Sequence, residues 1–222
     1  APAGDDLVRV TGRVLDPDGK PKADADVYLT RWHWDERYPR EPLASMRSDA
    51  QGRFALSFSK SDRRLAVDAE RPEMWRVVSV CAFAPGFGPA WSNATESGET
   101  ELTLVRDLPV RGRVLDLEGQ PVAGARVSVS SIDATAAPES LDGFLADPAK
   151  PWNLLSRGLQ LPPAHPIACE TRPDGSFELS GIGRERHVFV DVRGPTIAQA
   201  SLRVVTRPIE TVTWEAGDMM SM

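Results

Sequence analysis

The chain has 222 residues, a formal net charge of -6 and a hydrophobic content of 41%. An acidic chain with scattered basic residues lacks the electrostatic footprint of a protein that binds duplex nucleic acid. No apolar run approaches the roughly 18 residues that indicate a membrane-spanning helix. The sequence therefore predicts no nucleic-acid partner and no transmembrane segment.

The first predicted element is a β-hairpin over residues 8–30. Val8, Val10, Gly12 and Val14 fall two apart, which fits a strand with one buried face. DPDG at 16–19 supplies the turn, because Asp bonds its own backbone and Gly accepts a positive φ. The alternation resumes at Val27 and Leu29, so a second strand is expected there.

An aromatic segment follows this hairpin, with the sequence RWHWDERYPREP at 31–42. Trp32, His33, Trp34 and Tyr38 crowd together among charged residues. Exposed Trp and Tyr are enriched at interfaces, where their rings supply a large apolar surface and a polar tip. We take these four residues as candidate ligand-binding residues. The alternative is that at least one tryptophan closes the end of a sandwich or packs on the neighbouring domain.

Further short strands are predicted downstream, each next to a turn. SDAQGRFALS at 48–57 contains a turn followed by alternating Phe54 and Leu56. VVSVCAFAPGFG at 77–88 runs into a Pro/Gly turn, and ELTLV at 101–105 is a final short strand. No stretch has a convincing helical period, so an all-β fold is expected.

An internal repeat organises the whole chain. GRVLDPDGKPKADADVYLT at 12–30 recurs as GRVLDLEGQPVAGARVSVS at 112–130, and SDAQGRFALS at 48–57 recurs as TRPDGSFELS at 171–180. Self-similarity of this kind marks a repeated structural unit. A strand is expected at HVFVDVRGP (187–195), and SLRVV (201–205) is expected to close the second copy as ELTLV closes the first.

The repeat predicts two tandem antiparallel β-sandwich domains, at 7–107 and 108–208. The boundary lies near Asp107-Leu108-Pro109, and its shortness predicts that the two domains touch. The second copy carries an insertion at about 131–168 that contains Trp152, a further candidate ligand-binding residue. Its apolar content argues against disorder and predicts that it folds over its own domain or over the junction. The role of the tail at 209–222 is left open.

These motifs resemble the carboxypeptidase regulatory-like domain. The pattern G-x-V-x-D-x-x-G-x-P-x-x-G/A-x-x-V followed by T-D-x-x-G-x-F is similar to GRVLDPDGKPKADADV and SDAQGRFALS, with Arg172 in place of Asp49 in the second copy. The tandem copies look most like repeats in large planctomycete-type bacterial proteins. The resemblance implies a transthyretin-like (prealbumin-like) sandwich. The motif residues of that family specify turns and core, and carry no catalytic role.

Reactive chemistry is weakly supported by the residues. Intradiol dioxygenases share the fold class and hold iron with two Tyr and two His, but Tyr28, Tyr38 and the three histidines lack that family's spacing. His165 and Cys169 are four apart without the second pair that a zinc site needs. His187 is expected to be a partly buried strand residue. DPDG lacks the longer oxygen series of a calcium loop.

The two cysteines fall in different halves of the chain. We expect Cys81 and Cys169 to be separate, at least partly buried thiols, since free cysteine prefers the interior. A bridge between them, which would cross the domain boundary, is the alternative.

The sequence as a whole predicts a non-enzymatic structural, adhesive or interaction module pair of a larger bacterial envelope or surface protein. The alternative is a carbohydrate-binding module that uses exposed aromatics, and a metal-dependent, intradiol-dioxygenase-like enzyme is a less favoured third class. No cofactor and no metal are predicted. The expected partners are proteins or glycans and the neighbouring domains of a longer parent protein. The expected location is extracytoplasmic, in the periplasm or on the cell surface.

Overall fold

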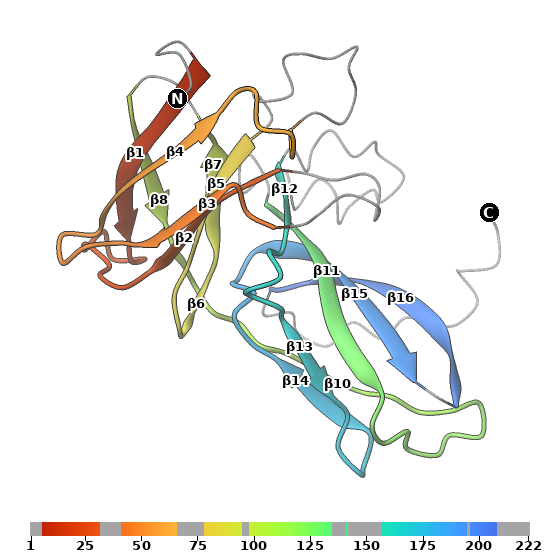
Figure 1. Cartoon of the computed structure of the whole chain (residues 1–222). Coiled ribbons are helices and arrows are strands. Elements are labelled where there is room, and N and C mark those ends of the chain that lie inside the picture. Colours follow the sequence, from red (N-terminus) through yellow and green to blue (C-terminus); the bar gives the residue numbers. More distant parts are fainter. Residues whose placement is uncertain are drawn as a thin grey trace.

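A computed structural model of the chain shows an all-β architecture whose described strand pairs are antiparallel except for one parallel pair near the N-terminus (Figure 1). The structure describes residues 6–31, 41–65, 78–94, 98–134, 141, 157–194 and 196–207. Among these residues no helix is long and apolar enough to cross a bilayer.

The first half of the chain forms a sandwich that we call the N-terminal sandwich. One sheet has the order β4-β1-β8, and the facing sheet has the order β3-β2-β5-β7. The strands of the first sheet are β1 (Leu7–Leu15), β4 (Arg53–Ser59) and β8 (Glu99–Thr103). The strands of the second are β2 (Asp26–Arg31), β3 (Ala44–Arg47), β5 (Val78–Phe83) and β7 (Ala90–Asn93).

Alternation along β1 and β4 builds the core between these sheets. Every second residue of both strands is buried, and the buried set includes Val10, Leu56 and Phe58. They pack with Leu29 and Val80 from the opposite sheet in one apolar cluster. The two-residue period read from the sequence therefore places one face of each strand in the core.

The second half forms the C-terminal sandwich. A two-stranded sheet of β10 (Val110–Arg113) and β14 (Ser176–Leu179) lies against a five-stranded sheet. That larger sheet has the order β12-β11-β15-β16, with β13 also paired to β11. Its strands are β11 (Arg126–Ala134), β12 (Arg157–Gln160), β13 (Ala168–Glu170), β15 (Arg186–Gly194) and β16 (Ile197–Val205).

The same turn chemistry opens both copies. Asp16 Oδ1 accepts hydrogen bonds from the backbone N–H groups of Asp18 and Lys20, both at 2.9 Å. Asp116 Oδ1 accepts the corresponding bonds from Glu118 and Gln120. These carboxylates hold their own turns, as expected for Asp in a turn.

One sequence-based strand assignment is wrong. SLRVV at 201–205 was expected to be the counterpart of ELTLV at 101–105, but it forms the end of β16, which pairs with β15. Pairing positions match it to β7 instead: Ala82 faces Ala90 in the first copy, and Val192 faces Ala200 in the second. The alternation of apolar residues in ELTLV and SLRVV is too weak to show which segment is an outer strand of the larger sheet and which closes the opposite sheet.

Candidate functional site at the junction of the two sandwiches

The predicted ligand-binding residues Trp32, His33, Trp34, Tyr38 and Trp152 lie outside the described residues. The first four directly follow Arg31, the last residue of β2. Arg31 is buried and donates from Nη1 to the carbonyl oxygens of Arg64 (3.1 Å) and Leu65 (3.0 Å).

The described histidines and cysteines do not form a metal centre. His187 is 1% exposed and its Nδ1 lies 3.1 Å from Asp133 Oδ2, so it is a fully buried strand residue where a partly buried one was expected. His165 contacts Asp26, and it does not share a metal site with Cys169. Within the described part of the chain, no three His, Cys, Asp or Glu side chains come together as metal ligands.

Both cysteines are free, so the bridge between them that the sequence left open does not form. Cys81 is fully buried on β5, and its Sγ lies 3.6 Å from the Tyr28 carbonyl oxygen. Burial raises the pKa of the Cys81 thiol to about 12. Because the thiolate is the nucleophilic form, this side chain is inert at neutral pH.

The largest constellation of side chains lies where the two sandwiches meet. Tyr28, Cys81 and Phe83 project from the outer face of the β2–β5 sheet and belong to the apolar cluster of the C-terminal sandwich. They share that cluster with Ile132 and Ile182 of the second copy. The N-terminal sandwich thus has one sheet buried on both faces, and the apolar interior continues from one sandwich into the next.

His165 fastens one side of this junction. Its ring stacks on Phe83 with centroids 4.6 Å apart and an interplanar angle of 5°, and it meets Tyr28 edge-on at 5.4 Å. His165 Nε2 lies 3.1 Å from Asp26 Oδ2 at the start of β2. His165 belongs to the predicted insertion, so the described end of that insertion reaches across the junction.

Asp107 fastens the connecting segment. Its carboxylate accepts three backbone N–H bonds from the loop before β15: from Gly181 at 2.8 Å, and from Ile182 and Gly183 at 3.0 Å each. Next to it, the short strands β6 (Phe87–Gly88) and β9 (Val105–Arg106) pair with each other. Charge-assisted bonds to backbone N–H groups are among the stronger hydrogen bonds in proteins, so the linker is held against the C-terminal sandwich.

Two glycines allow this close approach. A Cβ placed on Gly88 would overlap the backbone of Ile182 and Gly183, and one on Gly183 would overlap the side chain of Val105. Gly183 also has a φ of +91°, a conformation that favours glycine. The GIG sequence at 181–183 is the only local signal for this contact, and it identifies neither Asp107 nor Gly88 as its partner.

Arg186 lies on the opposite side of the junction from His165. Its guanidinium carbon is 4.9 Å from the centre of the Trp91 ring, and Nη2 donates to the Pro89 carbonyl oxygen at 3.4 Å. Burial lowers the pKa of Arg186 to about 10. An arginine over an indole face is a favourable cation–π contact when it is desolvated. Trp91 is therefore a junction residue.

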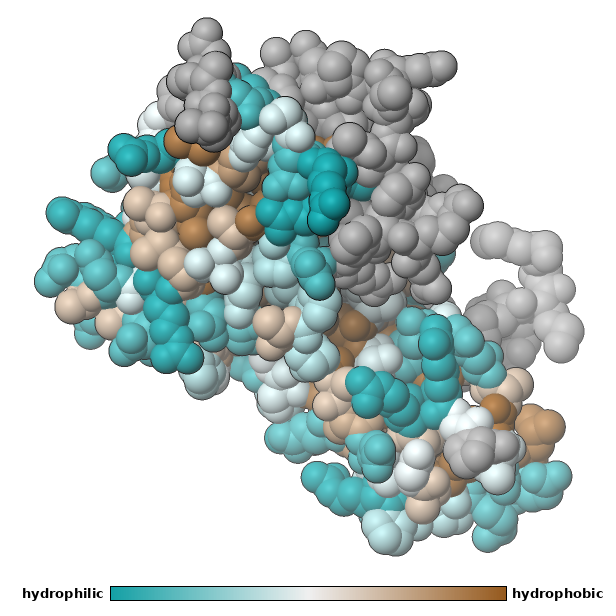
Figure 2. Space-filling view, in the orientation of Figure 1, coloured by the Kyte–Doolittle hydropathy of each residue, from teal (hydrophilic) through white to brown (hydrophobic). Residues whose placement is uncertain are grey.

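The junction contains packing, clamps and buried charge, but the described residues bring no nucleophile, base and oxyanion donors together. The contacts at the junction hold one sandwich against the other. Figure 2 shows a mostly polar surface, with hydrophobic residues on this face of the N-terminal sandwich and at the far end of the C-terminal sandwich, where β16 and the loop after β10 meet.

No protein-family model matches the chain, and neither does any curated protein. The carboxypeptidase regulatory-like resemblance therefore stays a prediction. Some solved structures of bacterial pilins do match.

The shaft pilin SpaA from Lactobacillus rhamnosus GG is 13% identical, with 90% of this chain and 95% of that chain covered and a TM-score of 0.31. A streptococcal ancillary pilin is 11% identical over 95% of this chain and 62% of that chain, with a TM-score of 0.31. The pilus backbone protein RrgB from Streptococcus pneumoniae is 10% identical, covers 98% and 63%, and has a TM-score of 0.29. These values are too low for the likeness to carry an argument about function.

Proposed function

We propose that this chain is a non-enzymatic structural module pair that transmits mechanical load within a larger bacterial envelope or surface protein. The sequence resemblance and the repeated turn and core residues support a scaffold role. We further propose that the chain divides into domains at 7–107 and 108–208, and that it works outside the cytoplasm with protein or glycan partners and with neighbouring domains of its parent protein.

One feature of the N-terminal sandwich carries this proposal. The first and last strands of that sandwich, β1 and β8, are parallel neighbours, with Thr11 to Leu15 paired to Glu99 to Thr103. A pull on the start of β1 and on the end of β8 acts along both strands in opposite directions. In this shear geometry the hydrogen bonds that pair the two strands have to break together. When two antiparallel strands are pulled apart from one end, their hydrogen bonds break one at a time.

The junction completes the argument, because a load has to pass from one sandwich to the next. The polypeptide leaves β8, passes β9 and enters the C-terminal sandwich through Asp107, whose carboxylate is bonded to the loop at 181–183. The continuous apolar cluster keeps the two sandwiches in contact beside that clamp. A joint of this kind suits a rigid spacer better than a flexible tether.

Single-molecule pulling tests the proposal. Cysteine handles at Leu7→Cys and Thr103→Cys load β1 and β8 in shear, and handles at Leu7→Cys and Lys60→Cys peel β1 from β4, where Leu7 faces Ser59. Both variants carry Cys81→Ala and Cys169→Ala. We expect a clearly higher rupture force in the shear geometry, because forced unfolding reports the barrier to unfolding. Equal forces in the two geometries would remove the mechanical argument.

Glycan binding is a second candidate function, favoured by the aromatic segment that begins directly after β2. The test is binding of the full chain to cell-wall and polysaccharide fractions. Replacing Trp32, Trp34 and Tyr38 together with alanine is expected to abolish such binding, because aromatic rings supply the contact surface. The matched control replaces Trp91, which lies inside the junction. Binding that survives the triple replacement unchanged would exclude the aromatic segment as the site.

A further inference from the structure

The C-terminal sandwich has an open strand edge where the N-terminal sandwich has a paired one. In the first copy β1 lies between β4 and β8. In the second copy β10 pairs with β14, and among the described residues no strand pairs with its other edge. A strand edge with unpaired N–H and C=O groups is a template for the addition of another strand.

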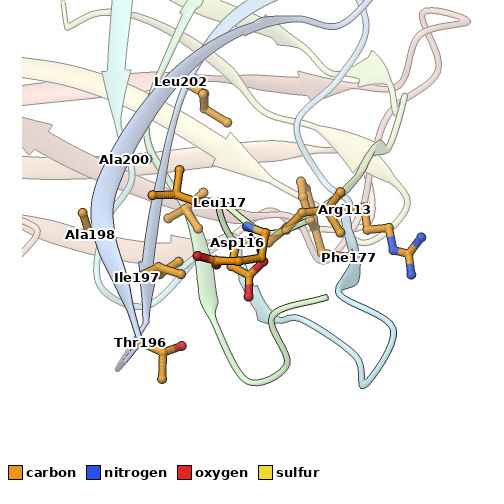
Figure 3. A pocket seen from close by; sticks show the side chains of 13 residues that line it. Arg113, Asp116, Leu117, Phe177, Thr196, Ile197, Ala198, Ala200 and Leu202 are labelled. Atoms are coloured by element: carbon orange, nitrogen blue, oxygen red, sulfur yellow. Dashed lines mark hydrogen bonds between the residues drawn. The ribbon is translucent and has the colours of Figure 1, made fainter. Parts of the chain in front are cut away.

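An apolar groove lies beside this edge. It has a volume of about 520 Å³ and is lined by side chains from β16 and from the loop after β10, as Figure 3 shows. Leu115, Leu117 and Leu202 in its lining are 47%, 102% and 49% exposed, and they are three of the four large hydrophobic residues that the described part of the chain exposes. Exposed apolar surface gathered in one groove marks a place for a partner.

The matching place in the N-terminal sandwich shows what kind of partner fits. There Leu102 of β8 and Leu104, which follows the strand, cover the core and are each 1% exposed. Val14 is fully buried opposite Leu102. Val114, the counterpart of Val14, is only half-buried. The groove thus has the position and the apolar lining of a slot for an extended strand with alternating apolar side chains.

The two copies keep one constant spacing near this slot. Val27 of the first copy pairs with Ala82, and its counterpart Val127 pairs with Val192. Ala82 of β5 therefore corresponds to Val192 of β15, which lies 110 positions later in the chain. Ala90 and Ala200 continue the same spacing into β7 and β16.

Extending the 110-residue spacing places residues 209–213 opposite the described β8. Leu102, Thr103 and Leu104 then correspond to Val212, Thr213 and Trp214, which repeat the apolar alternation of β8. The connection is shorter than in the first copy, because β16 ends at Val205 and leaves three residues before residue 209, whereas five residues separate Asn93 from Glu99. An extended stretch of that length reaches roughly 10 Å, which is the distance between packed sheets.

We propose that residues 209–215 add to the open edge of β10 within the same molecule, as a parallel strand. The register follows that of β1 with β8, so Val212 lies beside Val114, and Val212 and Trp214 fill the groove. An intramolecular strand is favoured over one from a second copy because the short connection after β16 gives it a high effective concentration. The added strand gives the C-terminal sandwich the same parallel pairing of first and last strands as the N-terminal sandwich.

Disulfide trapping in the full chain tests both the strand and its register. Leu115→Cys with Thr213→Cys joins the positions that correspond to the Leu15–Thr103 pair. The matched control, Leu115→Cys with Ile209→Cys, keeps the same face but moves the partner by four residues, roughly 13 Å along a strand. Both variants carry Cys81→Ala and Cys169→Ala.

Under mild oxidation we expect the 115–213 variant to form a disulfide within the monomer and the 115–209 variant to remain reduced. Intact mass and mobility on a non-reducing gel measure both results. Covalent dimers would show that the strand comes from a second copy, and equal trapping of both variants would show that no register exists. Either result, or the absence of any disulfide, overturns the proposal, and none of them depends on the mechanical role.

Discussion

The two sandwiches begin with nearly the same sequence, but within the described ranges the strand that it forms is paired on both edges in one sandwich and on one edge in the other. GRVL at 12–15 lies in a strand paired on both edges, and GRVL at 112–115 lies at an edge that the described residues leave open. Val14 is fully buried, whereas its counterpart Val114 is only half-buried. The covering strand begins almost ninety residues later in the chain. The burial of a repeated residue is therefore set by the strand that closes its sheet, and the repeat motif alone does not determine it.

The largest effect is expected from the covering strand itself. Leu102→Ala removes a fully buried side chain from the N-terminal core. It should cost about 3 kcal/mol of unfolding free energy, since Leu→Ala replacements in cores lose about 2–5 kcal/mol. Urea unfolding followed by circular dichroism measures the change.

Leu7→Ala is the matched control for this prediction, because Leu7 is exposed at the start of β1 and does not line the groove. Its effect should stay within about 0.5 kcal/mol, as for other surface changes. A loss at Leu102 no larger than the loss at Leu7 would contradict the covering role of β8.

The next prediction uses two matched glycines. A Cβ on Gly12 would overlap the backbone of Thr100 in β8 as well as the ring of Phe54, whereas one on Gly112 meets only the ring of Phe177. Gly12→Ala should cost about 2–3 kcal/mol, because overpacking next to immobile backbone forces shifts. If the proposed strand at 209–215 adds to β10, Gly112→Ala should cost as much in the full chain.

A chain ending at Arg207 separates the two contributions. Without the proposed strand only the movable ring of Phe177 opposes a methyl group at position 112, so the cost of Gly112→Ala should fall. The cost of Gly12→Ala should not change. Unfolding free energies of the four combinations form a double-mutant cycle. An unchanged cost at Gly112 after truncation would show that nothing covers β10 in the full chain.

The linker is expected to have a somewhat smaller effect. Asp107→Ala leaves three backbone N–H groups of the loop at 181–183 without their carboxylate. The loss should be about 2 kcal/mol, in the range for hydrogen bonds to a charged group. Because the clamp joins the sandwiches, calorimetry should also show the single transition dividing into two. Asp107→Asn keeps one acceptor oxygen, so its unfolding free energy should lie between those of the parent and Asp107→Ala. If Asp107→Ala were as stable as the parent, the clamp would be ruled out.

Local pattern was enough to predict the strands and turns but not their partners. The alternation in β1 and β4 and the Asp-Gly turns follow from neighbours in the sequence, and the structure has them where they were expected. SLRVV was expected to be the closing strand of the second copy, but that segment ends β16 and pairs with β15, so its partner was predicted wrongly. The clamp of Asp107 and the stacking of His165 on Phe83 join residues far apart in the chain, and no spacing rule links them.

The outer faces of the sheets give a second comparison and a pH prediction. Cys81 on β5 faces the junction and is fully buried, whereas Asp191, its counterpart on β15, is partly exposed and accepts a bond from Ser201 Oγ at 2.6 Å. Burial holds the pKa of Cys81 at about 12, above the ordinary value of 9.0. Below pH 9 the thiol is protonated in both the folded and the unfolded chain.

Between those two values a rising pH favours the unfolded chain, which loses the proton while the folded chain keeps it. At pH 10 the loss should be about 1.4 kcal/mol, because one pKa unit corresponds to roughly 1.4 kcal/mol.

Burial also raises the pKa of the neighbouring Tyr28, so the pH dependence of the parent's stability has more than one source. The informative quantity is the difference between the parent and Cys81→Ala, measured by urea unfolding at pH 8 and at pH 10. The parent should lose more stability over this interval than Cys81→Ala. Equal losses in the parent and Cys81→Ala would mean that Cys81 is not sealed in the junction.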